Sequence, residues 1–332
     1  MKYNSNILAT IGKTPLIQVN FFKKKIDSLV LAKAESFNPG GSVKDRVAKK
    51  MVEAAEHSGA LQPGGTIIEL TSGNTGIGLA LVAAVKEYNL ICVVTDKISQ
   101  EKINLMQAMR AQVRVCPNDV KSHDPRSALA VTQQLVREIP DAWWPNQYDN
   151  KVNVQTHYEE TGPEIWEQTG GQVTHFVAGV GTGGTISGVG KFLKEKNQNI
   201  KVWGIEPYGS FMTHYYQHGV FNEEIISPYI TEGIGGDRLY DNINFSVIDG
   251  FTQVTDRDAA VYTRKFALVE GILGGNSTGA AIKGILQLKK NFRPEDVVVF
   301  MLPDHGSNYL SKIFNQDWME QQAFLEDNGN HY

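Results

Sequence analysis

The sequence is poor in cysteine, lacks long apolar runs and carries no excess of positive charge. Cys92 and Cys116 lie in two separate apolar runs and lack the C-x-x-C spacing of zinc or redox sites. No apolar stretch reaches the roughly 18 residues of a membrane span, and we expect no signal peptide. A net charge of -4 does not favour binding to nucleic acid or to anionic membranes. These absences argue against a disulfide scaffold, a membrane protein or a nucleic-acid binder, so the expected location is the cytoplasm.

Histidine is sparse as well, with eight residues in 332. We expect no two of them on one helix face and predict no metal site. The hydrophobic content of 41% and charged content of 20% are those of an ordinary globular protein, long enough for two domains.

Strand-like and helix-like segments alternate along most of the chain. This order predicts an α/β fold of two open twisted domains with a cleft between them. The predicted smaller domain is 37–148, with a parallel sheet; the larger is 13–36 plus 149–325, after an N-terminal arm at 1–12. Strands are predicted at 28–32, 66–70, 90–95, 113–116, 174–178, 201–205, 244–248 and 296–302, and helices at 44–58, 77–88, 100–109, 126–139, 185–195, 255–270 and 277–290.

One lysine stands at a predicted helix entrance. Ser42 and Asp45 have the spacing of a capping box, and the helix from Lys44 should run to Ser58 and stop at Gly59. Two interpretations remain open for Lys44. It is either a solvated first-turn residue or a reactive amine, shielded from water so that its ordinary pKa of about 10.4 falls.

A glycine-rich turn follows the predicted strand at 174–178. Residues 179–184 fit G-x-G-x-x-G, and Glu206 stands where a dinucleotide enzyme places its ribose-binding acid. An NAD(P)-dependent Rossmann oxidoreductase is therefore one hypothesis. The hydroxyls of Thr182 and Thr185 favour a single phosphate monoester instead. A tight turn without a ligand is the third possibility.

Two further polar loops precede predicted helices. Residues 71–75 offer hydroxyls, an amide and helix N-terminal N–H groups suited to a carboxylate, although a plain N-cap turn is the alternative. The turn at 275–280, taken alone, indicates only an N-cap. Together, a reactive lysine, a phosphate loop and a carboxylate loop are what an amino-acid enzyme with pyridoxal phosphate requires.

With these motifs, residues 7–324 resemble the fold type II pyridoxal-phosphate family of cysteine synthases and cystathionine β-synthases. The segment 39–46 resembles the family's P-x-x-S-V-K-D-R box, which implies that Lys44 is the Schiff-base lysine. The resemblance implies a cofactor site, with Asn74 on the phenolic oxygen and Ser277 at the pyridine nitrogen, and a substrate site. The implied cofactor residues are Lys44, Asn74, Gly181, Thr182, Gly183, Gly184, Thr185 and Ser277, and the implied substrate residues are Thr71, Ser72, Gly73, Asn74, Thr75, Gln147 and Gly233.

The implied activity is a β-replacement that joins serine, or an O-activated serine, to a thiol through an aminoacrylate, with Lys44 as base and then acid. Segments 37–42, 232–237 and 302–319 are more similar to cystathionine β-synthases, which use serine and homocysteine. A cysteine synthase that uses sulfide with O-acetylserine or O-phosphoserine is the alternative, and a non-catalytic sensor is a further one. The resemblance also implies a homodimer. The chain departs from the pattern at Gly236, Lys151 and Glu160, where tyrosine, proline and threonine are usual.

Overall fold

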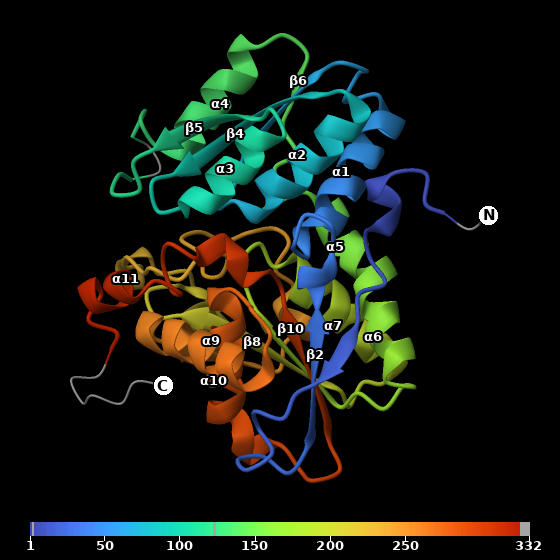
Figure 1. Cartoon of the computed structure of the whole chain (residues 1–332), viewed down its shortest axis with the longest axis vertical. Coiled ribbons are helices and arrows are strands. Elements are labelled where there is room, and N and C mark those ends of the chain that lie inside the picture. Colours follow the sequence, from blue (N-terminus) through green and yellow to red (C-terminus); the bar gives the residue numbers. More distant parts are fainter. Residues whose placement is uncertain (2, 122–123, 326–332) are drawn as a thin grey trace.

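The computed structural model describes residues 1, 3–121 and 124–325. Two separate sheets organise the chain (Figure 1), and the predicted α/β class is confirmed. One has the order β1-β2-β10-β7-β8-β9, parallel except for the antiparallel β1, and the other is the parallel sheet β5-β4-β3-β6. The strands are β1 (Leu16–Gln18), β2 (Leu29–Ala34), β3 (Thr66–Leu70), β4 (Asn89–Thr95), β5 (Gln112–Cys116), β6 (Ala142–Trp143), β7 (His175–Gly179), β8 (Lys201–Pro207), β9 (Gly250–Val254) and β10 (Val297–Leu302).

Helices cover both faces of each sheet, so the central strands can be apolar throughout. On the four-stranded sheet, α1 (Lys44–Ser58), α2 (Asn74–Lys86) and α3 (Gln100–Ala108) pack on one face and α4 (Ala128–Glu138) on the other. On the six-stranded sheet, α9 (Asp256–Glu270) and α10 (Asn276–Leu288) cover one face, and α6 (Gly162–Gln168), α7 (Gly184–Lys196) and α8 (Met212–His218) cover the other. The short helices α5 (Lys151–Thr156) and α11 (Gln316–Gln321) complete the set.

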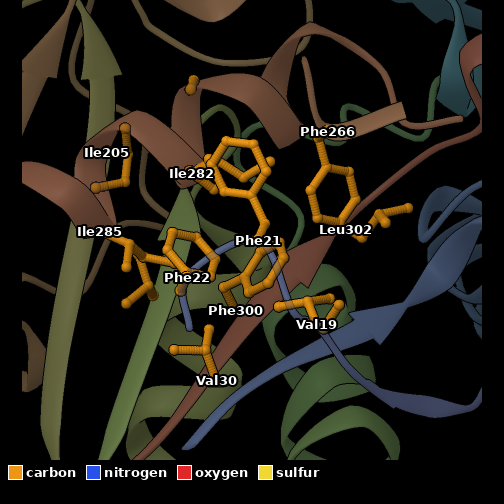
Figure 2. Close-up of a cluster of buried hydrophobic side chains, with 14 of the residues drawn as sticks. Val19, Phe21, Phe22, Val30, Ile205, Phe266, Ile282, Ile285, Phe300 and Leu302 are labelled. Carbon is orange, nitrogen blue, oxygen red and sulfur yellow. The ribbon is translucent and has the colours of Figure 1, made fainter. Parts of the chain in front are cut away.

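The largest buried cluster lies between the six-stranded sheet and α9 and α10 (Figure 2). Phe21 and Phe22, from the segment that joins β1 to β2, meet Phe266 of α9 and Phe300 of β10 edge to face. All six residues of β10 are buried, as expected for the interior of a parallel sheet. This packing fixes the end of β10, from which the site is built.

The start of α1 differs from its predicted cap. The helix spans Lys44–Ser58 and ends at Gly59 with φ 76°, as predicted. Val43 directly precedes the helix, and the Ser42 hydroxyl accepts from the N–H of Lys44 at 3.2 Å, as a capping side chain does, but Asp45 accepts from the N–H of Gly40 and does not close the capping box. The reason is tertiary, because the N–H of Val43 donates to the carbonyl of Pro303 and draws the loop onto the end of β10.

Two further predictions are wrong. The segment 244–248 is a 3-10 turn (Phe245–Val247) capped by the Asn244 side chain, and strand β9 begins only at Gly250. His214 and His218 share one face of α8, with ring centroids 4.5 Å apart, although no such pair was expected. Within the described ranges, no cluster of three or more potential metal ligands occurs, and no helix is long and apolar enough to cross a membrane.

Candidate active site

The loop before α1 is fastened to the carboxyl end of β10. Besides the bond from Val43 to Pro303, the N–H of His305 donates to the carbonyl of Gly41 at 3.0 Å. Parallel strands place the loops at their carboxyl ends on one edge of a sheet, where ligands of α/β proteins bind. Lys44 therefore begins its helix at the same edge as the loop that follows β7.

A pocket opens at this edge. It brings together Lys44 and much of the predicted phosphate loop with Gly233 of the segment after α8. Of the predicted site residues, Lys44, Gly181, Thr182, Gly183, Thr185 and Gly233 line it. Gly184, Ser277, Gln147 and the loop 71–75 lie outside the lining.

The Lys44 amine is the only cationic group in this lining. The side chain is half-buried, and its Nζ makes no hydrogen bond or ion pair with any residue that the structure describes. Burial lowers the pKa of Lys44 to about 8, while the negative charges of Asp304 and Glu35 act in the opposite direction. At a pKa of about 8, a larger fraction of the amine is neutral near pH 7 than in an ordinary lysine, which favours the reactive-amine interpretation.

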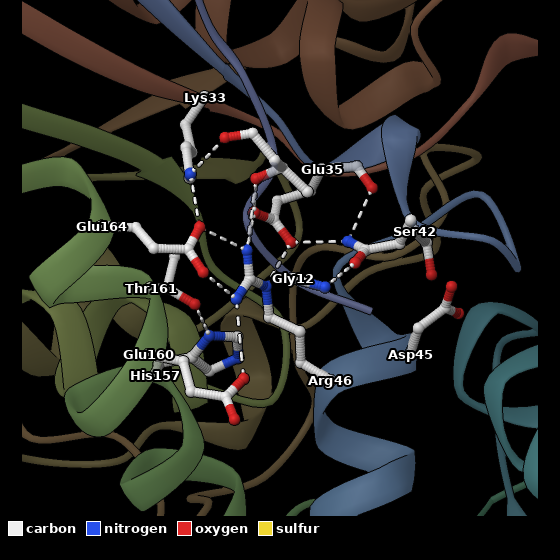
Figure 3. A network of polar contacts seen from close by, with 12 residues as sticks. Gly12, Lys33, Glu35, Ser42, Asp45, Arg46, His157, Glu160, Thr161 and Glu164 are labelled. Atoms are coloured by element: carbon white, nitrogen blue, oxygen red, sulfur yellow. Dashed lines mark hydrogen bonds and ion pairs between the residues drawn. The ribbon is translucent and has the colours of Figure 1, made fainter. Parts of the chain in front are cut away.

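A buried ionic network holds the first turn of α1 in place (Figure 3). The Arg46 guanidinium pairs with Glu35 of the segment after β2 and with Glu164 of α6 at 2.7–2.9 Å. Glu160, one of the departures from the family pattern, adds a carboxylate 3.5 Å from Arg46 and 3.3 Å from Lys50. Because Arg46 lies two residues after Lys44, this network fixes the backbone that carries the amine.

The loop at 181–185 exposes backbone donors at the start of α7. A Cβ on Gly181 would lie 2.5 Å from the Gly233 carbonyl oxygen, and Gly183 has φ 86°, so both positions need glycine. Within the described residues, the N–H groups of Gly181, Thr182 and Gly183 donate no hydrogen bond. Unpaired N–H groups at a helix N-terminus form a site for an anion.

Glu206 does not take the role that the dinucleotide hypothesis gives it. Its carboxylate is fully buried and accepts hydrogen bonds from the N–H groups of Met212 and Thr213, at the start of α8, and from Gln253. A carboxylate occupied in this way has no free face for a ribose. The Rossmann oxidoreductase hypothesis therefore loses the residue that distinguished it from simple phosphate binding.

The loop 71–75 uses most of its own hydroxyls to hold its shape. Thr71 Oγ1 accepts from the N–H of Gly73, and the Thr75 hydroxyl donates to Gln147 Oε1 at 2.5 Å. The Gln147 amide in turn donates to the Leu70 carbonyl, so this buried residue supports the loop from behind. Ser72 is exposed, which leaves its hydroxyl available to a substrate carboxylate.

Asp304 is a buried residue that sequence reasoning did not assign to the site. Its Oδ2 accepts from Asn74 Nδ2 at 2.8 Å and from the Tyr309 hydroxyl at 2.5 Å, while its Oδ1 is buried without a partner. It thus links the loop 71–75 to the end of β10. The available signal was its place two residues after a fully apolar strand.

Ser277 lies in the first turn of α10. The side chain is 4% exposed, and no hydrogen bond of its hydroxyl occurs in the described part of the chain. Gly275, the N-cap of α10, packs on the Asp304 carboxylate, where a Cβ would overlap Oδ1. The Ser277 hydroxyl is therefore available to a bound group.

These features fit pyridoxal phosphate, which needs an amine, a phosphate site and a hydrogen-bond partner for its ring. The match to known proteins agrees. Residues 7–304 match the family model of pyridoxal-phosphate dependent enzymes. The chain belongs to this family.

Comparison with relatives and solved structures shows which members of the family the chain resembles. The chain is 42% identical over 327 residues to a cystathionine beta-synthase of Apis mellifera, covering 98% of this chain and 64% of that protein. Two crystal structures are 36% identical and superpose with a TM-score of 0.84: a hydrogen sulfide-producing enzyme from Fusobacterium nucleatum and an O-acetylserine dependent cystathionine beta-synthase from Helicobacter pylori. They cover 93% and 94% of this chain, which covers 100% and 99% of theirs. The chain spans less than two thirds of the length of the cystathionine beta-synthases of Apis mellifera, Oryctolagus cuniculus and Rattus norvegicus.

Proposed function

We propose that this chain catalyses a β-replacement that joins serine, or an O-activated serine, to a thiol, with serine and homocysteine as the substrate pair. The observation that carries the proposal is the partnerless amine of Lys44, whose pKa is lowered to about 8, in one pocket with the unpaired N–H groups of Gly181, Thr182 and Gly183. The names of the relatives support this class of reaction.

The cofactor residues in this proposal come from both sides of the pocket. Lys44 holds the cofactor covalently, the loop Gly181, Thr182, Gly183, Gly184 and Thr185 holds its phosphate, and Asn74 and Ser277 face its ring. When bound, pyridoxal phosphate supplies an electron sink that makes the substrate Cα–H acidic and allows the β-substituent to leave. Asn74 donates to Asp304, and the charge of Asp304 acts on Lys44, which supports placing both residues at one site.

Lys44 also moves the proton in this proposal. Once the substrate amine has taken the place of Lys44 on the cofactor, the neutral Lys44 Nζ takes the proton from the substrate Cα. The oxygen substituent leaves Cβ and takes up the proton that the thiol gives up, and the thiol sulfur bonds to Cβ. The same Nζ, now protonated, returns its proton to Cα, so one group serves as base and acid. An amine with a pKa of about 8 suits both roles near neutral pH.

The substrate carboxylate is assigned to the loop Thr71, Ser72, Gly73, Asn74 and Thr75, with Gln147 and Gly233 beside it. The free hydroxyl of Ser72 and the helix start behind it support this assignment. We further propose domains at 37–148 and at 13–36 plus 149–325, which the separate sheets support. A cytoplasmic homodimer acting in transsulfuration is proposed on the family resemblance alone.

The first test is the visible absorbance of purified wild type and Lys44→Ala, before and after addition of L-serine or O-acetylserine. The wild type should be yellow and should change its spectrum with one of the two donors. Lys44→Ala should lose both the band and the response. Lys50→Ala, on the same helix but in an ion pair with Glu160, should behave as wild type.

The donor that changes the spectrum identifies the first substrate, and product formation with homocysteine or sulfide then separates the two candidate activities. A wild-type chain that stays colourless and takes up no added pyridoxal phosphate would overturn the proposal.

A further inference from the structure

A buried histidine lies directly behind the proposed phosphate loop. His157 begins a π-helical turn (His157–Thr161) and is fully buried. Its Nδ1 lies 3.0 Å from the Thr161 hydroxyl oxygen, as Figure 3 shows, and its Nε2 lies 3.2 Å from the hydroxyl oxygen of Thr185. The ring therefore joins a hydroxyl in the protein interior to one that lines the pocket.

The surroundings keep this ring uncharged. Burial, followed by the positive charges of Lys44 and Arg46, holds the pKa of His157 well below its usual range. The Arg46 guanidinium is itself engaged with Glu35 and Glu164. A neutral imidazole carries one N–H and one acceptor nitrogen, so His157 can donate to only one of its two threonines.

The two tautomers have different consequences for Thr185. If Nδ1 carries the proton, Nε2 accepts a hydrogen bond from the Thr185 hydroxyl, which then cannot donate elsewhere. If Nε2 carries the proton, it donates to Thr185 Oγ1, the Thr161 hydroxyl donates to Nδ1, and the Thr185 proton is free to point into the pocket. A phosphate only accepts hydrogen bonds, so it selects the second arrangement.

We propose that His157 is a positioning residue that turns the Thr185 hydroxyl into a donor for the cofactor phosphate, through a relay that runs from Thr161 to His157 to Thr185. The inference rests on the assignment of the loop 181–185 to that phosphate. It does not depend on which amino acid or thiol the enzyme uses.

Two variants separate the two ring nitrogens. His157→Gln places an amide donor near the position of Nε2 and keeps the bond to Thr185. His157→Asn reaches only the position of Nδ1 and loses that bond. The cofactor-free chain, titrated with pyridoxal phosphate, should bind about 10-fold or more weakly in His157→Asn, the effect of one lost hydrogen bond to a charged group. His157→Gln should stay within about threefold of wild type.

Pyridoxal, which lacks the phosphate, is the control ligand. Its affinity should be the same in wild type and His157→Asn. Thr185→Val should weaken pyridoxal phosphate about as much as His157→Asn, and the double variant should weaken it no further, because both changes remove one donor. Equal losses in the Gln and Asn variants, additive losses in the double variant, or an equal loss for pyridoxal would overturn the proposal.

A spectroscopic measurement on the wild type covers the case in which a variant fails to fold. Long-range ¹H–¹⁵N NMR of the holoenzyme should show His157 as the tautomer with its proton on Nε2, and a proton on Nδ1 would refute the relay. None of these measurements requires turnover. A chain that binds the cofactor through this relay but shows no spectral response to serine or O-acetylserine would therefore refute only the proposed function.

Discussion

The loops 71–75 and 181–185 have the same local design and different supports. Each follows a parallel strand and starts a helix, β3 to α2 for 71–75 and β7 to α7 for 181–185. We call residues 37–148 the four-stranded half and residues 13–36 plus 149–325 the six-stranded half, after their sheets. The loop 181–185 is held by residues of its own six-stranded half, since Asn153 donates to Thr182 and His157 contacts Thr185. The loop 71–75, in the four-stranded half, is bonded to the six-stranded half by the hydrogen bond from Asn74 to Asp304.

A second polar contact between the two halves, centred on Lys102 and Glu232, lies beside Ser72. Lys102 of α3 is fully buried, and its Nζ lies 3.5 Å from the Ser72 carbonyl, 2.8 Å from Glu232 and 3.0 Å from the Tyr309 hydroxyl. Lys312 pairs with the other oxygen of Glu232 at 2.6 Å. The loop 71–75 thus bonds to the six-stranded half directly at Asn74 and through Lys102 at Ser72, whereas the hydrogen bonds that link the loop 181–185 to the four-stranded half run through Asn153, which also donates to the Gln147 carbonyl.

Removing the charge of Glu232 from this contact should have the largest effect on stability. Glu232→Gln leaves Lys102 buried without its carboxylate, which should lower the free energy of unfolding by about 3–5 kcal/mol. Urea denaturation measures this loss. Because the loop 181–185 takes no part in this contact, the affinity for inorganic phosphate should change little.

Glu195→Gln is the matched control, since Glu195 pairs with Lys191 at the surface with about half of each side chain exposed. It should cost at most about 1 kcal/mol. Similar losses in the two variants would show that Glu232 does not stabilise the contact between the sheets.

The comparison also shows what a sequence can reveal. The helix at Lys44 and the loops at 71–75 and 181–185 were predictable because apolar periodicity and glycine placement are local signals. Asp304 was not, because it meets Asn74 only through packing that joins residues 230 positions apart. His157 was missed because the segment 151–168 breaks into three short helical pieces, none long enough for a clear period.

Tertiary contacts also overrode local rules. Ser42 and Asp45 have the spacing of a capping box. The N–H of Val43 donates to Pro303 instead, and the Asp45 carboxylate accepts from the N–H of Gly40. Gln147 was predicted beside the substrate, and its amide is bonded to Thr75 and Leu70, so its assignment there remains a proposal.

A methyl group at Gly184 tests the support of the phosphate loop. A Cβ there would overlap Oδ1 of Asn153, the residue whose amide also holds Thr182. Gly184→Ala should cost about 1–3 kcal/mol of stability, as overpacking does, and should weaken pyridoxal phosphate binding. Thermal unfolding and absorbance titration measure the two effects.

Gly190→Ala, in the same helix, is the control for Gly184. Its Cβ would lie 3.2 Å from Val247 Cγ2, and alanine favours the helix, so stability should change little. If Gly184→Ala left both stability and binding unchanged while the loop still bound phosphate, the support we assign to Asn153 would be wrong.

The smallest predicted effect concerns the negative charge of Asp304 and the pKa of Lys44. Asp304→Asn keeps the shape of the side chain and removes a negative charge that raises the pKa of Lys44 against the effect of burial. The pKa should therefore fall below about 8. Only the neutral amine reacts with an acylating reagent, so the pH at which Lys44 of the cofactor-free chain is half-reactive should shift downward, as peptide mass spectrometry can measure. Asp249→Asn, whose carboxylate pairs with Lys194 and Lys201, should leave that midpoint unchanged, and an equal midpoint in Asp304→Asn would mean that Asp304 only supports the loop 71–75.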